Sequence, residues 1–470
     1  MSQYESVQPL NHSAPNVPQP NKDYEYWRNR ILFSTMIGYI FFYFVRKSIT
    51  MAMPGIEEEL GITKPMLGFY LTAHGVLYGV ARFVNGMWSD RVNPRYFMSA
   101  GLFLAALTNI GFGFSSLSWI MGTFWIINGW VQGMGFPPCA KSLCHWFAPE
   151  ERGIKFATWN ISHSMGAGLL FIMNSFVVAL GWRYCFFVPA ALAVSGSIFL
   201  LWALRDTPES MGFEPVEDYY DRKNGRPTLA ERSQANACLA GNVSNAVPKT
   251  DEESFWDILV EHVFSNWAVW VLCFANFFVY IVRFSILDWA PTFLTEKGID
   301  IKHAGWATAG YELFGALGII LSGILMDKLF KGRGAKVCLL YMLGCSIVSF
   351  FFWYADSSSL MVNASFLCGL GFFIYGPQCL IGCVAATLAT KKAGASSSGL
   401  TGLFGYLATI VTGLGVGSLV NATGEWNAIF IMLFICSFAA MLLFGLILNA
   451  TPPEILEKER REKEENQQSV

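Results

Sequence analysis

The chain has 470 residues, of which 53% are hydrophobic and only 14% are Asp, Glu, Lys or Arg. An average soluble protein has about 25% charged residues, so this chain could hardly cover a water-facing surface. The composition excludes a soluble enzyme, a nucleic-acid-binding protein and a secreted disulfide scaffold. The net charge of −2 says nothing about partners, because the charges are unevenly distributed along the chain.

Long stretches without any charged residue alternate with short basic segments. Five stretches contain no Asp, Glu, Lys or Arg: 96–140, 337–355, 357–390, 393–424 and 426–453. About 20 apolar residues in a helix are enough to cross the hydrocarbon core of a bilayer. We therefore predict an all-α polytopic membrane protein whose surroundings are the lipid bilayer.

The apolar segments predict twelve transmembrane helices in two sets of six. The first set lies near 31–53, 67–88, 96–114, 119–143, 155–178 and 183–204. The second set lies near 266–290, 303–326, 337–355, 359–386, 394–420 and 426–449. The expected divisions are an N-terminal tail (1–30), a six-helix half (31–204), a linker without apolar periodicity (205–260), a second half (261–450) and a C-terminal tail (451–470).

The distribution of basic residues predicts the orientation. If the N-terminus is cytoplasmic, 23 of the 32 Lys and Arg residues lie in cytoplasmic segments and four lie outside. Cytoplasmic loops of membrane proteins are enriched in Lys and Arg. We therefore expect both termini in the cytoplasm.

An internal repeat relates the two halves. The pattern Gly-x-x-x-Asp-Arg/Lys occurs at Gly86 to Arg91 and again at Gly323 to Lys328, with Asp90 and Asp327 in equivalent positions at an offset of 237. The same offset relates Arg46 to Arg283 and Tyr43 to Tyr280. Parallel repeats of this kind have a pseudo-two-fold axis along the membrane normal, and such carriers bind substrate between the halves near the midplane.

Arg46 and Arg283 are the most informative residues, because each lies within a predicted apolar helix. A charge at the centre of a membrane helix costs about 2.5–3.5 kcal/mol on insertion scales, so each arginine needs an anion. Structural ion pairs with Glu312 or Asp288 are one explanation. We favour a shared anion site, because symmetry turns both arginines toward the same axis. A planar guanidinium can bind a phosphoryl group with two parallel hydrogen bonds.

Other residues have two interpretations each. Arg82, one turn after Tyr78, could add charge to the cavity or extend to the nearby interface. Lys47 adjoins Arg46 and must point elsewhere, so we expect a structural salt bridge, with Glu312 as a candidate partner. His163 is either a hydrogen-bonded core residue or a substrate or gating residue. Five tyrosines could donate hydrogen bonds to an oxyanion or simply pack: Tyr39, Tyr43, Tyr280, Tyr375 and Tyr406.

Enzyme signatures are missing from the sequence. It contains no HExxH, no GxSxG and no P-loop GxxxxGK[ST], which are the patterns of zinc proteases, serine hydrolases and ATP-binding proteins. The cysteines form no CxxC pair. We expect a secondary transporter rather than an enzyme, with no metal and no cofactor.

The joint pattern resembles a known family. Gly86-x-x-x-Asp90-Arg91 and its repeat resemble the major facilitator superfamily, and further stretches across about 25–450 resemble its organophosphate:phosphate antiporters. These stretches are Gly38 to Lys47, Tyr78 to Arg91, Gln132 to Cys139, Glu151 to His163, Phe278 to Trp289, Tyr375 to Pro377 and Gly402 to Tyr406. That family includes carriers of glycerol 3-phosphate, hexose 6-phosphate and phosphoglycerate, and a hexose-phosphate sensor.

The resemblance implies exchange of a phosphate monoester for inorganic phosphate across a bacterial inner membrane, by a monomer. It implies that Arg46 and Arg283 hold the phosphate with His163 nearby, and that Lys47 joins a salt bridge. Residues implied to line the path are Tyr39, Tyr43, Asn160, Tyr280, Glu312, Tyr375 and Tyr406. Asp90, Asp288 and Asp327 are the remaining candidates for structural or gating ion pairs.

The sequence leaves the substrate open. Arg82 stands where several members have Lys, and Phe136 replaces a Trp of the glycerol-3-phosphate type. Ser398 and Thr401 replace an Asp/Lys pair of the hexose-phosphate carriers, yet 26–28 and 95–98 resemble the sensor branch. The alternatives are therefore a sensor of external hexose phosphate that signals to a kinase, and a proton-coupled sugar-phosphate symporter.

Overall fold

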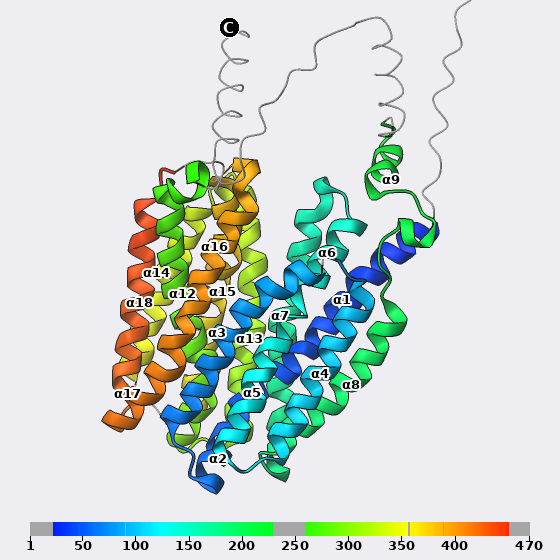
Figure 1. Cartoon of the computed structure of the whole chain (residues 1–470). Helices are drawn as coiled ribbons and strands as arrows, with labels where there is room; N and C mark the ends of the chain where they lie inside the picture. Colours follow the sequence, from blue (N-terminus) through cyan, green and yellow to red (C-terminus); the bar gives the residue numbers. More distant parts are fainter. Residues whose placement is uncertain are drawn as a thin grey trace, which may run out of the picture.

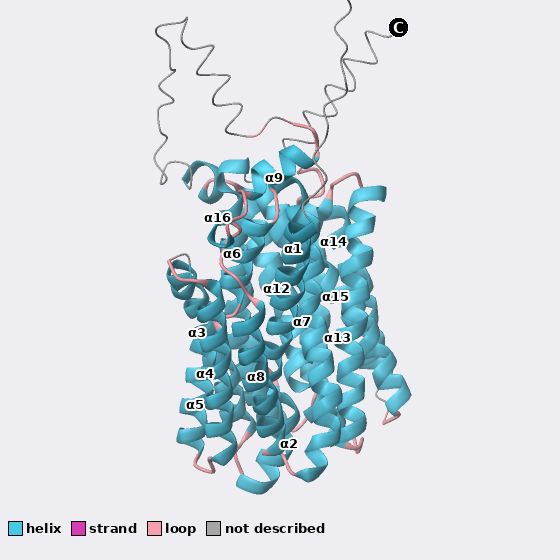
Figure 2. Ribbon diagram, turned by 90° about the vertical axis from the view of Figure 1, so that its right-hand side faces the viewer, coloured by secondary structure: helices cyan, strands magenta, loops and turns pink. Residues whose placement is uncertain are grey.

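The structure, a computed structural model, describes residues 22–89, 91–226, 228, 260–355, 358–388 and 390–450. Within these residues the secondary structure is entirely helical, as Figure 2 shows. Nine helices in the described part of the chain are long and apolar enough to cross a membrane. The prediction of an all-α polytopic protein is confirmed.

The first half runs from α1 to α8 (Figure 1). Its elements are α1 (Lys22–Arg46), α2 (Ser48–Leu60), α3 (Lys64–Ser89), α4 (Pro94–Phe114), α5 (Ser118–Gln132), α6 (Phe136–Trp146), α7 (Pro149–Val177), η1 (Val178–Leu180) and α8 (Tyr184–Ala203). Two short elements follow, η2 (Glu209–Met211) and α9 (Val216–Lys223).

The second half begins with a short π-helix, η3 (Val260–Phe264), and runs to α18. Its elements are α12 (Trp267–Glu296), α13 (Ile301–Ile324), η4 (Leu325–Leu329), α14 (Gly334–Ala355), α15 (Leu360–Leu388), α16 (Thr390–Ile410), η5 (Val411–Gly415), α17 (Val416–Thr423) and α18 (Asn427–Leu446). With α1–α2, α5–α6 and α16–α17 each counted as one interrupted span, this order is consistent with twelve crossings.

The first crossing is interrupted beside its arginine. We expected one helix over 31–53, but α1 ends at Arg46 and α2 begins at Ser48, with Lys47 between them at φ −115° and ψ 10°. The equivalent helix α12 continues through Arg283 to Glu296. The offset of 237 nevertheless also relates Pro54 in α2 to Pro291 in α12, so α1–α2 together correspond to α12.

The boundaries at the end that holds Lys22 and α9, called here the inner end, differ from the prediction. The first helix begins at Lys22 rather than near 31, and part of the expected linker is structured as η2 and α9. The Tyr219 ring of α9 stacks on Tyr24 of α1 at 4.1 Å, and Glu25 accepts hydrogen bonds from Tyr219 (2.9 Å) and Lys223 (2.6 Å). These few aromatic and ionic contacts order a segment that has no apolar period. Residues 1–21 of the expected N-terminal tail (1–30) and the expected C-terminal tail (451–470) lie outside the described residues.

The two halves meet closely at the opposite, outer end, which holds Gly61 and Gly298. Lys64 pairs with Glu57 in its own half (3.0 Å) and with Glu296 in the other half (2.9 Å). Thr72 of α3 donates to the Thr409 carbonyl oxygen (3.0 Å) and accepts from the Leu414 amide (2.9 Å). Toward the inner end of Figure 1 the ribbons of α6 and α16 stand on opposite sides. The contacts between the halves therefore tie the outer end together.

Candidate anion-binding site

Arg46 and Arg283 are both buried, with 8% and 4% of their surface exposed. Among the described residues, neither guanidinium forms an ion pair with a carboxylate. The Arg46 guanidinium carbon lies 3.8 Å from the ring centre of Tyr78 and 5.4 Å from that of Tyr43. The buried charge of Arg46 thus contacts two aromatic faces, and these contacts offset only part of the cost of burying it.

Arg283 has a similar aromatic environment. Its guanidinium carbon lies 4.9 Å from the ring centre of Tyr375, 5.1 Å from Phe284 and 5.7 Å from Tyr280. Its Nε is buried without a hydrogen-bond partner. Because a buried charged donor without an acceptor is costly, this nitrogen marks a place where an anion would stabilise the protein.

Shared neighbours show that the basic residues of the two halves are close together. The Arg46 guanidinium contacts the Tyr78 ring, and the Tyr78 ring lies 5.2 Å from that of Tyr406 in the other half. The Tyr406 ring in turn lies 5.8 Å from that of Tyr280, which the Arg283 guanidinium contacts. The inference from the repeat offset, that the two arginines turn toward one region, agrees with this geometry.

Lys47 forms the expected ion pair, but with a different partner. Its ammonium group pairs with Asp288 of α12, not with Glu312. The pair is buried and crosses between the halves, since Lys47 lies at the α1–α2 break and Asp288 lies five residues after Arg283. It neutralises Asp288, and this carboxylate therefore does not compensate Arg283.

Glu312 has another role than the predicted salt bridge. One carboxylate oxygen accepts a hydrogen bond from Tyr375 at 2.5 Å, and the other is buried without a partner. The Tyr375 ring also contacts the Arg283 guanidinium at 4.9 Å, and within the described part of the chain Glu312 forms no ion pair with that arginine. It offers a free acceptor beside the arginine, which suits a hydroxyl group of a ligand.

Arg82 lies between the two halves rather than at the membrane interface. Its guanidinium carbon stacks on Phe136 at 3.7 Å, and it donates to the Tyr406 hydroxyl of the other half at 3.4 Å. Tyr406 in turn contacts the rings of Tyr78 (5.2 Å) and Tyr280 (5.8 Å). Of the two interpretations, the structure favours the one in which Arg82 adds positive charge to the region between the halves.

His163 lies on α7 and is surrounded by aromatic rings of α1 and α7. Its ring centre lies 4.7 Å from Tyr39, 5.5 Å from Tyr43 and 5.2 Å from Trp159. Nδ1 lies 3.0 Å from the carbonyl oxygen of Asn160, so Nδ1 carries a proton. In the neutral ring Nε2 is then an acceptor, and only the protonated imidazole can donate to a phosphate. The Asn160 side chain donates to the Cys379 sulfur of the other half at 3.4 Å.

Two predicted gating residues cannot be placed. Asp90 and the side chain of Asp327 lie outside the described residues. A group of His, Cys, Asp or Glu residues able to hold a metal ion is not found in the described part of the chain.

The space beside Arg46 is small in this conformation. A cavity of about 20 Å³ is lined by residues of both halves, among them Arg46, Lys47, His74 and Thr409. One water molecule needs about 10–15 Å³, so this cavity holds about one water and no phosphate ester.

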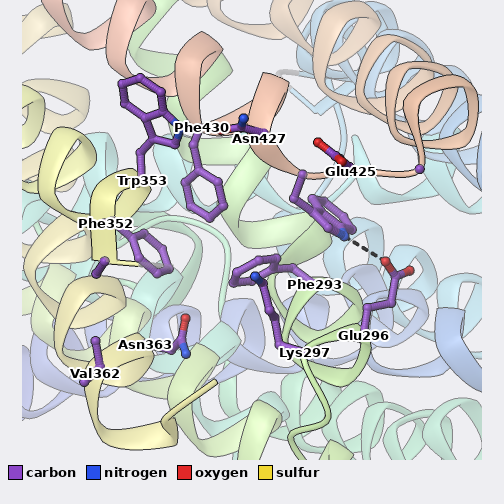
Figure 3. Close-up of a pocket in the computed structure, with 13 residues that line it drawn as sticks. Phe293, Glu296, Lys297, Phe352, Trp353, Val362, Asn363, Glu425, Asn427 and Phe430 are labelled. Atoms are coloured by element: carbon purple, nitrogen blue, oxygen red, sulfur yellow. Dashed lines mark hydrogen bonds between the residues drawn. The ribbon is translucent and has the colours of Figure 1, made fainter. Parts of the chain in front are cut away.

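A larger cavity of about 480 Å³ lies at the outer end of the second half (Figure 3). Figure 3 shows Phe352, Trp353 and Phe430 on one side and Glu296 and Glu425 on the other. Phe293 lies ten residues after Arg283, about 15 Å along α12. Its lining holds one lysine, Lys297, and two carboxylates, of which Glu296 already pairs with Lys64. This cavity therefore has no excess of positive charge to attract a phosphate, unlike the region of Arg46 and Arg283.

The sequence did not single out Tyr78 or Phe136 as site residues. Tyr78 makes the shortest contact with Arg46, and Phe136 the shortest with Arg82. The spacing of Tyr78 one turn before Arg82 suggests a contact between these two residues on one helix face, but the Tyr78 ring instead contacts Arg46 of α1, which the spacing does not predict.

Comparison with known proteins identifies the family. The family model described as Major Facilitator Superfamily matches residues 35–413. The chain belongs to this superfamily. That assignment confirms the predicted fold class and the prediction of a transporter-family protein rather than an enzyme.

Curated relatives narrow the comparison within the Major Facilitator Superfamily. A probable hexose phosphate transport protein of Chlamydia pneumoniae is 39% identical, over 92% of this chain and 93% of the relative. A glycerol-3-phosphate transporter of Bacillus subtilis (strain 168) is 38% identical, over 91% and 93%. The membrane sensor protein UhpC of Escherichia coli (strain K12) is 33% identical, over 92% and 94%. The predicted resemblance to the organophosphate:phosphate antiporter family is confirmed.

Solved structures support the same fold. A bacterial homologue of the human lysosomal transporter Spinster, in its inward-facing and occupied conformation, matches with a TM-score of 0.64 and 13% identity, over 90% of this chain and 95% of that one. At this identity the match supports the fold alone.

Proposed function

We propose that this chain is a secondary transporter that exchanges a phosphate monoester for inorganic phosphate. We place it in a bacterial inner membrane as a monomer with both termini in the cytoplasm, because the relatives are bacterial and the basic residues gather at the inner end. The names of relatives at 39% and 38% identity support the substrate class.

The observation that supports this most strongly is the pair of buried arginines that have no carboxylate partner among the residues that the structure describes. Each of Arg46 and Arg283 costs about 2.5–3.5 kcal/mol at a membrane midplane, and Asp288 is already paired with Lys47. A phosphate dianion between Arg46 and Arg283 would compensate both charges at once. Planar guanidiniums fit its oxygens with parallel hydrogen bonds.

Exchange follows from this electrostatic arrangement. Without ligand, the like charges of Arg46 and Arg283 repel across the two halves. A bound dianion attracts both, so the halves can close at the inner end and open at the outer end. A ligand shifts such an equilibrium only through its different affinity for the two states. Either phosphate species neutralises the site, whereas the empty carrier reorients slowly.

Opening the outer end would require specific contacts to break. Lys64–Glu296 crosses directly between the halves there, and Lys47–Asp288 crosses nearer the arginines. We propose that both pairs act in gating. The unpartnered oxygen of Glu312 would accept a hydroxyl group of the ester, which leaves glycerol 3-phosphate and hexose 6-phosphate as the two candidates.

A sensor of hexose phosphate is the second candidate function. The 33% identity with UhpC favours it, and so does the ordered surface that α9 forms against α1 at the inner end. A sensor would bind the ester at the same arginines and transmit the resulting conformational change to a partner kinase, without completing the exchange reaction.

Counterflow in proteoliposomes tests the proposal. Vesicles loaded with inorganic phosphate should take up labelled glycerol 3-phosphate or glucose 6-phosphate, and empty vesicles should not. Uptake into empty vesicles driven by a proton gradient would instead support a symporter. Ester binding without any counterflow would favour the sensor.

A further inference from the structure

Three arginines meet at the inner end of α8, away from the site between the halves. Arg30 comes from α1, Arg95 from α4 and Arg205 from the segment after α8; these three helices pack together (Figure 1). The last carbonyl oxygens of α8 accept from them: Leu201 from Arg95, Trp202 and Ala203 from Arg30 (3.1 and 3.2 Å), and Trp202 and Leu204 from Arg205 (2.9 and 2.7 Å).

The positive charge of this cluster is not balanced by acids. Among the described residues, none of the three guanidiniums lies within 4.0 Å of a carboxylate oxygen. The nearest acid in sequence, Asp206, pairs instead with Lys141 at 3.7 Å. Burial, and then the charges of Arg95 and Arg30, lower the pKa of Arg205. A helix C-terminus supplies only about half a negative charge, so a net positive charge remains.

Aromatic side chains surround the cluster on its exposed side. The guanidinium carbon of Arg30 lies 4.1 Å from the ring centre of Trp202 and 4.6 Å from that of Trp27. Arg205 lies 5.1 Å from Trp27, and Arg95 lies 5.4 Å from Tyr96. Trp202 is 63% exposed and Tyr96 is 59% exposed. Exposed Trp and Tyr at the ends of membrane helices mark the headgroup region.

The apolar surface next to the cluster continues toward the bilayer centre. Ile198, one turn before Trp202 on α8, is 62% exposed, as expected for a residue that faces acyl chains. Each guanidinium has five N–H donors, and the hydrogen bonds to α8 use only some of them. The cluster therefore combines free donors at headgroup depth with an apolar surface directly below.

We infer that Arg30, Arg95 and Arg205 form a binding site for the phosphate of an anionic phospholipid. Planar guanidiniums bind phosphate oxygens in pairs, and basic pockets between membrane helices at the cytoplasmic side bind anionic headgroups. The position on the bilayer-facing perimeter favours a lipid over free phosphate, because the acyl chains can lie against Ile198 and Trp202. The site is separate from Arg46 and Arg283, so its test does not depend on transport.

Native mass spectrometry of the delipidated full chain tests this site. The protein is titrated with cardiolipin, phosphatidylglycerol and phosphatidylcholine, each with identical acyl chains. The variant is R30Q/R95Q/R205Q. The control is K331Q/R333Q/K336Q, which removes the same charge from the turn before α14 and the first turn of α14, in the second half at the same end. A further variant, R30K/R95K/R205K, retains the charge but lacks the planar guanidinium groups. It replaces the Gln variant in the comparison with wild type if the Gln variant is not monodisperse.

We expect wild type and control to bind both anionic lipids in preference to phosphatidylcholine. The Gln variant should bind the anionic lipids at least about tenfold more weakly, and the Lys variant should lose part of that affinity. Equal losses in the variant and the control would overturn the inference, because net charge would then explain the binding. It would also be overturned if the Lys variant kept the full preference, or if millimolar inorganic phosphate displaced the lipid completely.

Discussion

The buried ion pair between Lys47 and Asp288 permits a quantitative prediction. Both residues are buried, with 9% and 4% of their surface exposed, and their side chains come from opposite halves. Removing one partner of such a pair leaves an uncompensated charge, which costs about 3–5 kcal/mol. Neutralising both partners leaves no uncompensated charge, so much of this cost should be recovered. We therefore expect D288N to lower the thermal midpoint strongly, and K47Q/D288N to recover most of the loss.

The assay is a double-mutant cycle. Thermal unfolding of purified wild type, K47Q, D288N and the double variant is followed in detergent. Contacting charges couple by up to about 3 kcal/mol, so the double variant should be clearly more stable than the sum of the single losses implies. Strictly additive losses would show that the two residues do not interact in the folded protein. The reasoning about a buried ion pair between the halves would then be wrong.

Three further predictions concern gating and ligand binding. K64Q removes the link to Glu296 at the outer end, in which the side chains are 16% and 36% exposed. Ion pairs in contact with solvent are worth about 1 kcal/mol, so spin labels on α2 and α13 should report an outward-open population about two- to fivefold larger. An unchanged distance distribution would remove Lys64 from the gate. Ester affinity should rise from about pH 8 to about pH 6, because the bound state holds an extra proton on His163. H163Q should lose this part of the dependence, whereas the titration of the ester itself, whose second pKa is about 6, remains in both proteins. An identical pH profile for wild type and H163Q would show that His163 is a core residue. E312Q keeps an oxygen that can accept from the Tyr375 hydroxyl. It should weaken ester binding and leave inorganic phosphate binding unchanged. Equal losses for both ligands would contradict the proposal that Glu312 accepts a hydrogen bond from a hydroxyl group of the ester.

The sequence was sufficient for the features that depend on charge and period. Arg46 and Arg283 stand out because a charge in an apolar run is costly, and their equivalence follows from the offset of the repeat. The fold class follows from the same charge-free runs. These inferences need no knowledge of how the helices rotate about their axes.

The partner of Lys47 could not be predicted in the same way. The repeat relates Lys47 to Phe284, not to Asp288, because the helix break at Lys47 has no counterpart in α12. No Gly or Pro marks that break. Side-chain direction at an irregular residue depends on the packing of both halves, so Glu312 and Asp288 could not be distinguished from sequence.

The sequence also did not predict that the segment after α8 is structured. Among the contacts that fix α9 are those of Tyr219, Arg222 and Lys223 with Tyr24, Glu214 and Glu25. Such contacts leave no periodic pattern, and a polar segment with several prolines is indistinguishable from an unstructured linker.

The most direct test of the anion site is equilibrium binding of the labelled ester to R46K and R283K. The matched control is R222K, since Arg222 forms a half-exposed surface pair with Glu214 at 2.5 Å. Lysine keeps the charge but lacks the planar fork. We expect both site variants to fold and to lose ester and phosphate binding, and R222K to bind like wild type. Near-wild-type binding by R46K or R283K would contradict a phosphate held between the two guanidiniums.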